Sequence, residues 1–288
     1  MAKSFSMESL NAAQRKAVQT LQGPVLILAG AGSGKTRVLT TRIAWLISTG
    51  QVGPHGILAV TFTNKAAKEM TARLSSLLPI NVRGMWIGTF HGLCNRLLRA
   101  HYREAGLPQS FQILDSADQL AMVKRLLKNL NIDDEKYPPR ELCHFINAHK
   151  EQGIRAGQAE VYDSYTQKRV EIYAEYETQC NREGVVDFAE LLLRCYELLQ
   201  RNEPLRAHYQ QRFRHILVDE FQDTNRLQAG LLLAMRPDGR GLTVVGDDAQ
   251  SIYSFRGATV RNILDFPGQF STPARRITLD RNYRSTQP

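Results

Sequence analysis

The sequence predicts an α/β fold in which helices cover a parallel β-sheet and a helical insertion interrupts the order of the strands. Helical spacing at 36–48 and 64–78, the latter with Asn64 as its expected N-cap, alternates with short apolar runs. These runs are bounded by glycine or proline, as buried strands often are, and occupy residues 24–29, 56–62 and 84–90. The same pattern returns near the C-terminal end, in residues 214–219, 242–246 and 275–280.

The stretch between the two groups of strands has almost no strand signal. Its apolar residues recur with helical spacing in five segments, at about 91–104, 117–130, 139–150, 166–182 and 187–200. We therefore expect a discontinuous domain made of residues 1–89 and 215–288, with an all-helical insertion domain at 90–214.

Positive charge is concentrated near the start of the chain. The formal net charge is +9, and residues 1–89 hold ten lysines and arginines against two acids. Residues 90–214, by contrast, hold 18 basic and 18 acidic side chains. This asymmetry favours a polyanionic partner, although a solubilising basic surface would also explain it.

The sequence argues against membrane-spanning and secreted classes of protein. It has no apolar run of about 18 residues, the length that a transmembrane helix needs. The N-terminal residues lack the apolar core of a secretory signal. The four cysteines form no C-x-x-C pair, which fits reduced thiols in a cytosolic protein; they are Cys94, Cys143, Cys180 and Cys195.

The stretch LILAGAGSGKTRVLT, residues 26–40, joins an apolar strand to a helix through a glycine-rich loop. Such glycines let backbone N–H groups surround a phosphate, and the helix N-terminus favours negative charge. Lys35 would reach the β- and γ-phosphates and Thr36 would bind Mg²⁺. An ordinary strand-to-helix connection is the alternative. The candidate nucleotide-binding residues are Ala29, Gly30, Ala31, Gly32, Ser33, Gly34, Lys35 and Thr36.

Asp219 and Glu220 stand side by side where the strand at 214–219 ends. A carboxylate at a strand tip can coordinate Mg²⁺, and its neighbour can deprotonate an attacking water. Adjacent acids are also common by chance, but a position on a resumed strand after a phosphate loop favours function. The sequence thus predicts Mg²⁺-dependent hydrolysis of a nucleoside triphosphate.

Seven ordered motifs extend this prediction, and together they resemble the UvrD/Rep/PcrA group of superfamily 1 DNA helicases, in particular its UvrD branch. The motifs occupy residues 10–18, 29–37, 59–70, 88–93, 217–224, 244–258 and 279–285. The resemblance spans 8–286 and implies a RecA-like P-loop NTPase domain. It also implies an ATP-driven helicase or translocase that acts on single-stranded DNA.

The resemblance implies roles for residues outside the phosphate loop. Gln14 would read the adenine edge, which favours ATP, while Arg37 and Tyr283 would lie on the two faces of the adenine ring. Gln250 would sense the γ-phosphate, and Arg284 would stabilise transition-state charge. The implied catalytic residues are therefore Glu220, Gln250 and Arg284.

A motor that holds single strands without reading their sequence needs aromatic faces on which bases can stack. Candidate aromatic side chains lie at expected strand ends or in loops beyond them: Phe62, His91, Tyr253 and Phe255. Lys65 and Arg256 could add phosphate contacts, and Asn64 and Thr89 belong to the same motifs. Phe62 and Phe255 could instead be core aromatics.

The resemblance also implies biological context. The partners would be single-stranded DNA, single-strand/duplex junctions and DNA-repair proteins, with 3′ to 5′ movement and a cytoplasmic, nucleoid-associated location. Members of the group continue into a second RecA-like domain, so we expect these residues to be the first motor half, with weak activity alone. A non-motor, ATP-dependent DNA-binding switch is the alternative for the isolated chain.

Overall fold

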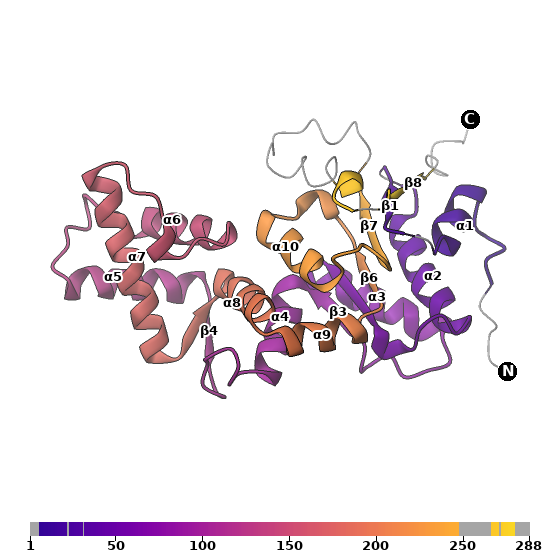
Figure 1. Cartoon of the computed structure of the whole chain (residues 1–288), viewed down its shortest axis with the longest axis horizontal. Helices are drawn as coiled ribbons and strands as arrows, with labels where there is room; N and C mark the ends of the chain where they lie inside the picture. The colour runs from indigo at the N-terminus through magenta and orange to yellow at the C-terminus, as the bar shows by residue number, and fades with distance from the viewer. Residues whose placement is uncertain (1–5, 22, 31, 248–265, 271, 280–288) are drawn as a thin grey trace. The chain divides into compact units, whose positions relative to one another are not determined.

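The computed structural model describes residues 6–21, 23–30, 32–247, 266–270 and 272–279 (Figure 1). The chain divides into two compact units, the first made of residues 1–93 and 202–288 and the second of residues 94–201. Helix α4 (Phe90–Ala100) carries the chain from the first unit into the second. No helix within the described ranges is long and apolar enough to span a membrane.

The first unit contains a six-stranded sheet in which every pair of neighbouring strands is parallel. The strand order is β3-β2-β6-β7-β1-β8, and each of the six expected strand segments contains one strand. The strands are β1 (Val25–Leu28), β2 (Ile57–Thr61), β3 (Trp86–Thr89), β6 (His215–Val218), β7 (Leu242–Gly246) and β8 (Arg275–Thr278). The predicted parallel sheet is confirmed.

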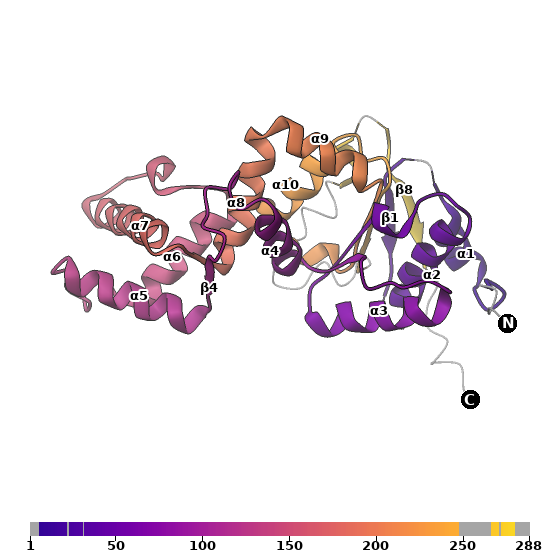
Figure 2. The same cartoon turned by 90° about the horizontal axis from the view of Figure 1, so that it is seen from below.

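Helices cover both faces of this sheet (Figure 2). One side carries α1 (Ala12–Gln19), α2 (Lys35–Ser48) and α3 (Asn64–Leu77), and the other carries α9 (Glu203–Arg212) and α10 (Arg226–Met235). The first three helices share one core with the strands. Because β2 and β7 are buried along their whole length, their sequences are mostly apolar and do not alternate between apolar and polar residues.

The start of α3 differs from the expectation by one residue. Asn64 is already the first helical residue, and the N-cap is Thr63, whose backbone is extended. The Thr63 hydroxyl oxygen accepts a hydrogen bond from the backbone N–H of Ala66 at 3.0 Å. Threonine and asparagine are both good caps, so their identity alone could not fix the boundary.

The second unit is mostly helical, but the expectation of an all-helical insertion is wrong in one detail. Besides α5 (Ser116–Asn129), α6 (Pro139–Glu151), α7 (Ser164–Glu183) and α8 (Phe188–Arg201), it contains two paired strands. These are β4 (Gln112–Leu114) and β5 (Val185–Asp187), which run parallel to each other. Strands of three residues are too short to show a period of two in the sequence.

The chain returns to the first unit at residue 202, earlier than the boundary at 214/215 that the sequence pattern predicts. Residues 202–214, including α9, group with the first unit. Tyr209 and Phe213 place their rings 6.0 and 5.2 Å from the ring of Trp86 in β3. These aromatic contacts attach α9 to the sheet. They join residues far apart in the chain, so no local sequence pattern predicts them.

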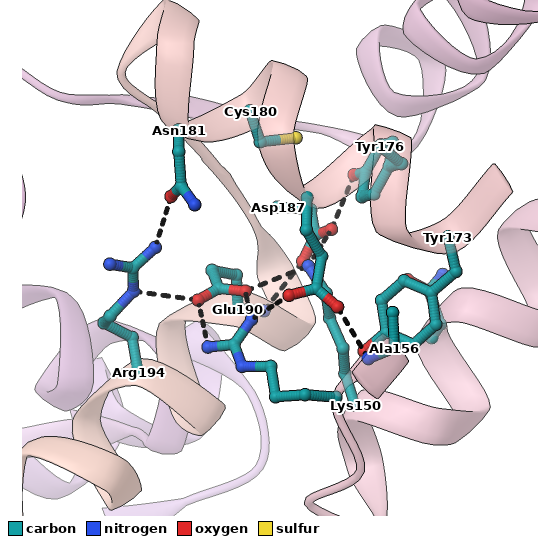
Figure 3. Close-up of polar contacts among 12 residues, drawn as sticks. Lys150, Ala156, Tyr173, Tyr176, Cys180, Asn181, Asp187, Glu190 and Arg194 are labelled. Carbon is teal, nitrogen blue, oxygen red and sulfur yellow. Dashed lines mark hydrogen bonds and ion pairs between the residues drawn. The ribbon is translucent and has the colours of Figure 1, made fainter. Parts of the chain in front are cut away.

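A network of buried charges joins the helices of the second unit (Figure 3). Lys150 in α6 has a side chain that is only 1% exposed, and its Nζ lies 2.8 Å from Asp187 Oδ2 and 3.0 Å from Glu190 Oε1. Arg155 donates two hydrogen bonds to Glu190, at 2.6 and 2.7 Å. Arg194 donates another to Glu190 at 2.9 Å. The network therefore links α6, β5 and α8.

Candidate active site

The candidate nucleotide-binding residues meet at the carboxyl edge of the sheet in the first unit. The phosphate loop follows β1, Asp219 and Glu220 follow β6, and Asp247 follows β7. Because β6, β7 and β1 are consecutive neighbours in a parallel sheet, the segments that follow them lie side by side. In open α/β sheets this edge is where ligands bind.

The phosphate loop has a conformation that requires glycine. Gly32 and Gly34 both have φ of +78°, and Gly34 is the N-cap of α2. A side chain on Gly34 would also place its Cβ 2.9 Å from Gln14 Nε2. The Ser33 hydroxyl donates to Gly30 O at 2.7 Å, and Ala29 N–H donates to Gly246 O at 2.9 Å, which anchors the loop to β7. The helix N-terminus thus lies directly behind the loop, as a phosphate site needs.

Gln14 is buried against this loop. Its Nε2 donates to Ser33 O at 3.1 Å, and its Oε1 accepts from Asn11 N–H at 3.1 Å within a capping box. A primary amide has two donor and two acceptor positions, so one of each remains for the predicted adenine contact. Arg37 is exposed and donates a hydrogen bond to the Ser9 hydroxyl. The adenine contacts of Gln14 and Arg37 stay predictions.

Lys35, the first residue of α2, is held by carboxylates. Its Nζ forms an ion pair with Glu220 Oε1 and lies 3.6 Å from Asp247 Oδ1. Burial acts to lower the pKa of Lys35, but Glu220, Asp219 and Asp247 together raise it above its usual value. The ammonium group therefore stays charged, and the two carboxylates paired with it, together with the charge of Asp219, give the cluster an excess of negative charge.

Asp219 supplies a carboxylate of the kind that a divalent cation needs. Its side chain is buried, and burial followed by the charge of Glu220 raises the pKa of Asp219 to about 6, against the opposing effect of Lys35. Its Oδ1 accepts one hydrogen bond, from Glu220 N–H at 2.9 Å. Mg²⁺ in nucleotide sites is usually held by one or two carboxylates together with substrate phosphates. Asp219 and the Thr36 hydroxyl in the first turn of α2 fit that donor set.

Glu220 has a backbone conformation that is uncommon for a residue with a side chain, with φ of 51° and ψ of 44°. Such a left-handed residue costs of order 1–3 kcal/mol and is found preferentially at functional sites. Its Oε2 accepts a hydrogen bond from Gln222, whose own Oε1 accepts from Asp247 N–H at 3.2 Å. Gln222 and Asp247 were not singled out from the sequence, although they lie within the motifs at 217–224 and 244–258. Their pairing depends on the adjacency of β6 and β7.

The described DNA-binding candidates lie at the same carboxyl edge, one strand further along. Phe62 and Lys65 follow β2, whereas Thr89 and His91 lie at the end of β3 and the start of α4. These two strands are neighbours, and Thr61 stands opposite Thr89 in the register. The parallel sheet therefore gathers residues from both motifs on the β2–β3 side of Asp219.

These candidates differ in how they are held. Asn64 and Lys65 are exposed at the N-terminus of α3, but Phe62 is half-buried and packs edge-to-face on Phe90, with ring centres 5.8 Å apart. The Thr89 hydroxyl oxygen accepts a hydrogen bond from Gly92 N–H at 3.0 Å. Burial lowers the pKa of His91, so its imidazole is neutral near pH 7 and would act as a stacking surface rather than as a cation.

Several predicted site residues lie outside the described residues, and their roles stay predictions. They are Ala31, Gln250, Tyr253, Phe255, Arg256, Tyr283 and Arg284.

A parallel sheet with a phosphate loop, a following helix and acids on the next strands defines a P-loop nucleoside triphosphatase domain. The family model described as UvrD/REP helicase N-terminal domain matches residues 10–271. The chain therefore belongs to the UvrD/REP helicase N-terminal domain family.

Curated relatives support this assignment. The chain is 50% identical to DNA helicase II of Escherichia coli K12 over 288 residues, an alignment that covers 98% of the chain and 39% of the relative. It is 50% identical over 285 residues to DNA helicase II of Haemophilus influenzae, with 97% and 39% covered. It is 42% identical over 283 residues to the ATP-dependent DNA helicase PcrA of Staphylococcus aureus NCTC 8325, with 98% and 39% covered. The chain thus spans about two fifths of the length of these relatives.

Proposed function

We propose that this chain is the ATP-binding first motor half of a DNA helicase or translocase that acts on single-stranded DNA. The observation that carries the proposal is the grouping of Lys35, Asp219 and Glu220 at one sheet edge, beside the segments that follow β2 and β3. The family and the names of the relatives, which are DNA helicases, support it.

The chemistry follows from the charges. When ATP binds, its phosphates would compete with Glu220 and Asp247 for the ammonium group of Lys35. Glu220 would then be free to accept the proton of the attacking water. Mg²⁺, held by Asp219 and Thr36, would neutralise charge on the β- and γ-phosphates. The Lys35–Glu220 ion pair is therefore the resting arrangement of two groups that separate when nucleotide arrives.

A direct backbone link connects the acids with the DNA candidates. Asp219 N–H donates to Val60 O at 3.0 Å, and β2 ends at the next residue, Thr61. A shift of Asp219 as metal and nucleotide bind would therefore move the end of β2, where Phe62 and then the first turn of α3 with Lys65 follow. Such coupling of nucleotide state to a strand-binding loop is what a translocase requires.

Further parts of the proposal rest on the family resemblance. We assign the first unit to the RecA-like motor domain and the second to its insertion. Movement from 3′ to 5′, action at single-strand/duplex junctions, DNA-repair partners and a cytoplasmic, nucleoid-associated location complete it. A stepping motor needs two bodies that open and close, so the 288 residues alone should bind Mg-ATP weakly and unwind nothing.

The proposal can be tested on the purified chain with Glu220→Gln. Single-turnover hydrolysis of Mg-ATP, with and without oligothymidylate, should be lost in this variant, because an amide cannot accept the water's proton, while Mg-ATP binding should persist. Glu69→Gln, at an exposed position of α3, is the matched control. Parental hydrolysis in Glu220→Gln would rule out Glu220 as the base.

A second assay separates the motor half from a complete motor or a simple switch. A fluorescent duplex with a 3′ single-stranded tail should stay paired when the chain and Mg-ATP are added. Strand separation that disappears in Lys35→Ala would show that the chain is itself a complete motor. Affinity for oligothymidylate that changes with nucleotide, without any hydrolysis, would favour the DNA-binding switch.

A further inference from the structure

We propose that the first unit has a second oxyanion site, which binds a phosphate-bearing ligand at the amino edge of the sheet. A pocket of about 540 Å³ opens there, and Arg214, His215, Arg236 and Arg240 contribute to its lining. The proposed ATP and DNA functions use none of these residues.

The position of the pocket separates it from the nucleotide site. Four of its lining residues lie within three residues before a strand: Gly23 before β1, Arg214 before β6, Gly241 before β7 and Thr272 before β8. In a parallel sheet all amino ends lie at the edge opposite the carboxyl ends. The phosphate loop and the paired acids follow the carboxyl ends of β1 and β6. A ligand in this pocket would therefore not compete directly with ATP.

The pocket contains more positive charge than its acids can balance. Among the described residues, Asp238 is the one carboxylate that the structure pairs with these arginines. It lies 3.8 Å from Arg236 Nη2 and 3.7 Å from Arg240 Nε, too far for good hydrogen bonds. The structure gives the guanidinium of Arg214 no acceptor within the described ranges. Three guanidinium groups against one carboxylate leave an excess of two positive charges.

Neighbouring groups increase this positive potential. Burial, together with the charges of Arg42, Arg214 and Arg236, lowers the pKa of His215 to about 4. The fully buried guanidinium of Arg42 donates from Nη1 to Ala17 O and Val18 O, at 3.0 and 3.1 Å, and these are backbone oxygens that carry no full charge. Neutral His215 can therefore offer a hydrogen bond without adding a cation, while the surrounding arginines attract an anion.

The walls of the pocket are held close by glycines. Gly241 has φ of +74°, and a Cβ there would lie 1.9 Å from Arg214 O, so only glycine lets these two segments approach. Gly23 has φ of +70°, and its Cβ would lie 3.4 Å from Thr272 Cγ2. The segments that carry the arginines are thus fixed by backbone packing, which reduces the ordering needed when a ligand binds.

This arrangement fits phosphate better than other ligand classes. Guanidinium groups present planar sets of donors that match phosphate oxygens, and an excess of two charges matches a dianion. Leu21, which is 38% exposed, adds an apolar patch at the wall where a sugar or base could lie. The phosphate could come from a free nucleotide or polyphosphate, or from a nucleic-acid backbone.

Pyrophosphate is the first probe, and the phosphate loop must be weakened so that it does not dominate. We therefore use Lys35→Ala as the background and titrate pyrophosphate by calorimetry at low salt. Adding Arg214→Glu and Arg240→Glu should weaken binding at least ~10-fold, because repulsion replaces two attractive contacts. Both positions are exposed, so the variant should fold. Arg73→Glu with Arg83→Glu, also exposed in the first unit, is the control with the same change in net charge and should alter affinity less than ~2-fold.

Two further arms identify the source of the phosphate. If ADP displaces pyrophosphate only while Arg214 and Arg240 are intact, the site takes a nucleotide; if oligothymidylate does so, the site takes a nucleic-acid backbone. The milder pair Arg214→Gln and Arg240→Gln should give an intermediate loss. The proposal is overturned if pyrophosphate does not bind at millimolar concentration, or if its affinity survives the glutamate substitutions.

Discussion

Two lysines in this chain are each held by two carboxylates, and they serve different ends. At the phosphate loop, the side chains of Lys35, Glu220 and Asp247 are 23%, 29% and 33% exposed. In the second unit, those of Lys150 and Glu190 are 1% and 5% exposed. The ions are the same in kind, so the difference must come from how completely each group is satisfied and enclosed.

The buried cluster is closed. Asp187 Oδ2 accepts hydrogen bonds from Lys150 at 2.8 Å and from the Tyr176 hydroxyl at 2.6 Å, while its Oδ1 accepts from Glu190 N–H at 2.7 Å (Figure 3). Glu190 is shared among Lys150 and two arginines, and these charges hold its pKa well below the usual range despite burial. With every charge matched from within the unit, this network has a structural role.

The cluster at the phosphate loop, formed by Lys35, Asp219, Glu220 and Asp247, is open: its charges are not all matched by partners within the part of the chain that the structure describes. Asp219 has a raised pKa because burial and Glu220 disfavour its charge, and Glu220 itself is in a left-handed conformation. Both features are unfavourable in the ligand-free chain, and a cation beside Asp219 would stabilise its charged form. The comparison teaches that the proposed nucleotide-binding cluster is the one whose electrostatic balance is left open for a ligand.

The largest expected effect is in the closed cluster. Lys150→Met should lower the free energy of unfolding of the second unit by about 3–5 kcal/mol, because it leaves Asp187 and Glu190 buried without their cation. Urea unfolding followed by hydrogen exchange in α6 and α8 measures this. Lys168→Met, at a side chain that is 43% exposed, is the control and should be nearly neutral. Equal stability of the two variants would break the comparison.

The open cluster should respond in affinity rather than in stability. Lys35→Ala should weaken Mg-ATP binding roughly 10²-fold, about 2.7 kcal/mol, because it removes the ammonium that faces the phosphates. Its unfolding free energy should change by less than about 1 kcal/mol, since the ion pair is partly exposed. Calorimetric titration with Lys68→Ala as control checks this. Unchanged ATP affinity in a folded variant would remove Lys35 from the site.

His215 extends the comparison to a partly buried group whose neighbours are cations. Its folded pKa of about 4 lies below the unfolded value, so the unfolded chain takes up a proton first and stability falls as pH drops from 7 towards 4. At pH 5 the loss from this group is at most about 2 kcal/mol. Chemical denaturation at pH 7 and 5 should show a weaker pH dependence in His215→Asn than in the parent or in His55→Asn. The same slope in all three would contradict the assigned shift.

The smallest expected effect is a change in the unfolding free energy on substitution of Asp219, and its sign is what tests the comparison. Asp219→Asn should raise the unfolding free energy of the ligand-free chain by about 1 kcal/mol, because it removes a buried charge beside Glu220. The same change should weaken Mg-ATP binding, since an amide is a poorer Mg²⁺ ligand than a carboxylate. Thermal melts and magnesium-dependent ATP titration, with Glu69→Gln as control, measure both. If the variant were less stable than the parent, Asp219 would have a structural role like that of Asp187 and Glu190.

The sequence by itself determined the strands, the phosphate loop and the acid pair. The four central strands, β1, β2, β6 and β7, are largely buried and therefore apolar, so short apolar runs located them. The edge strands β3 and β8 are less buried, but each still lies within a segment expected to form a strand. Gly32 and Gly34 could be identified because a left-handed turn around phosphate excludes side chains. These features depend on neighbours within a few residues, and local sequence encodes them directly.

The tertiary structure alone decided which distant residues meet. The order β2-β6-β7-β1 brings Gln222 next to Asp247. The two short strands of the second unit can be recognised only from their pairing with each other. The Lys150 network and the amino-edge pocket likewise join residues far apart in the chain, such as Gly23 and Arg214. Such contacts depend on strand order and helix packing, whereas periodicity and capping record only what happens within one element.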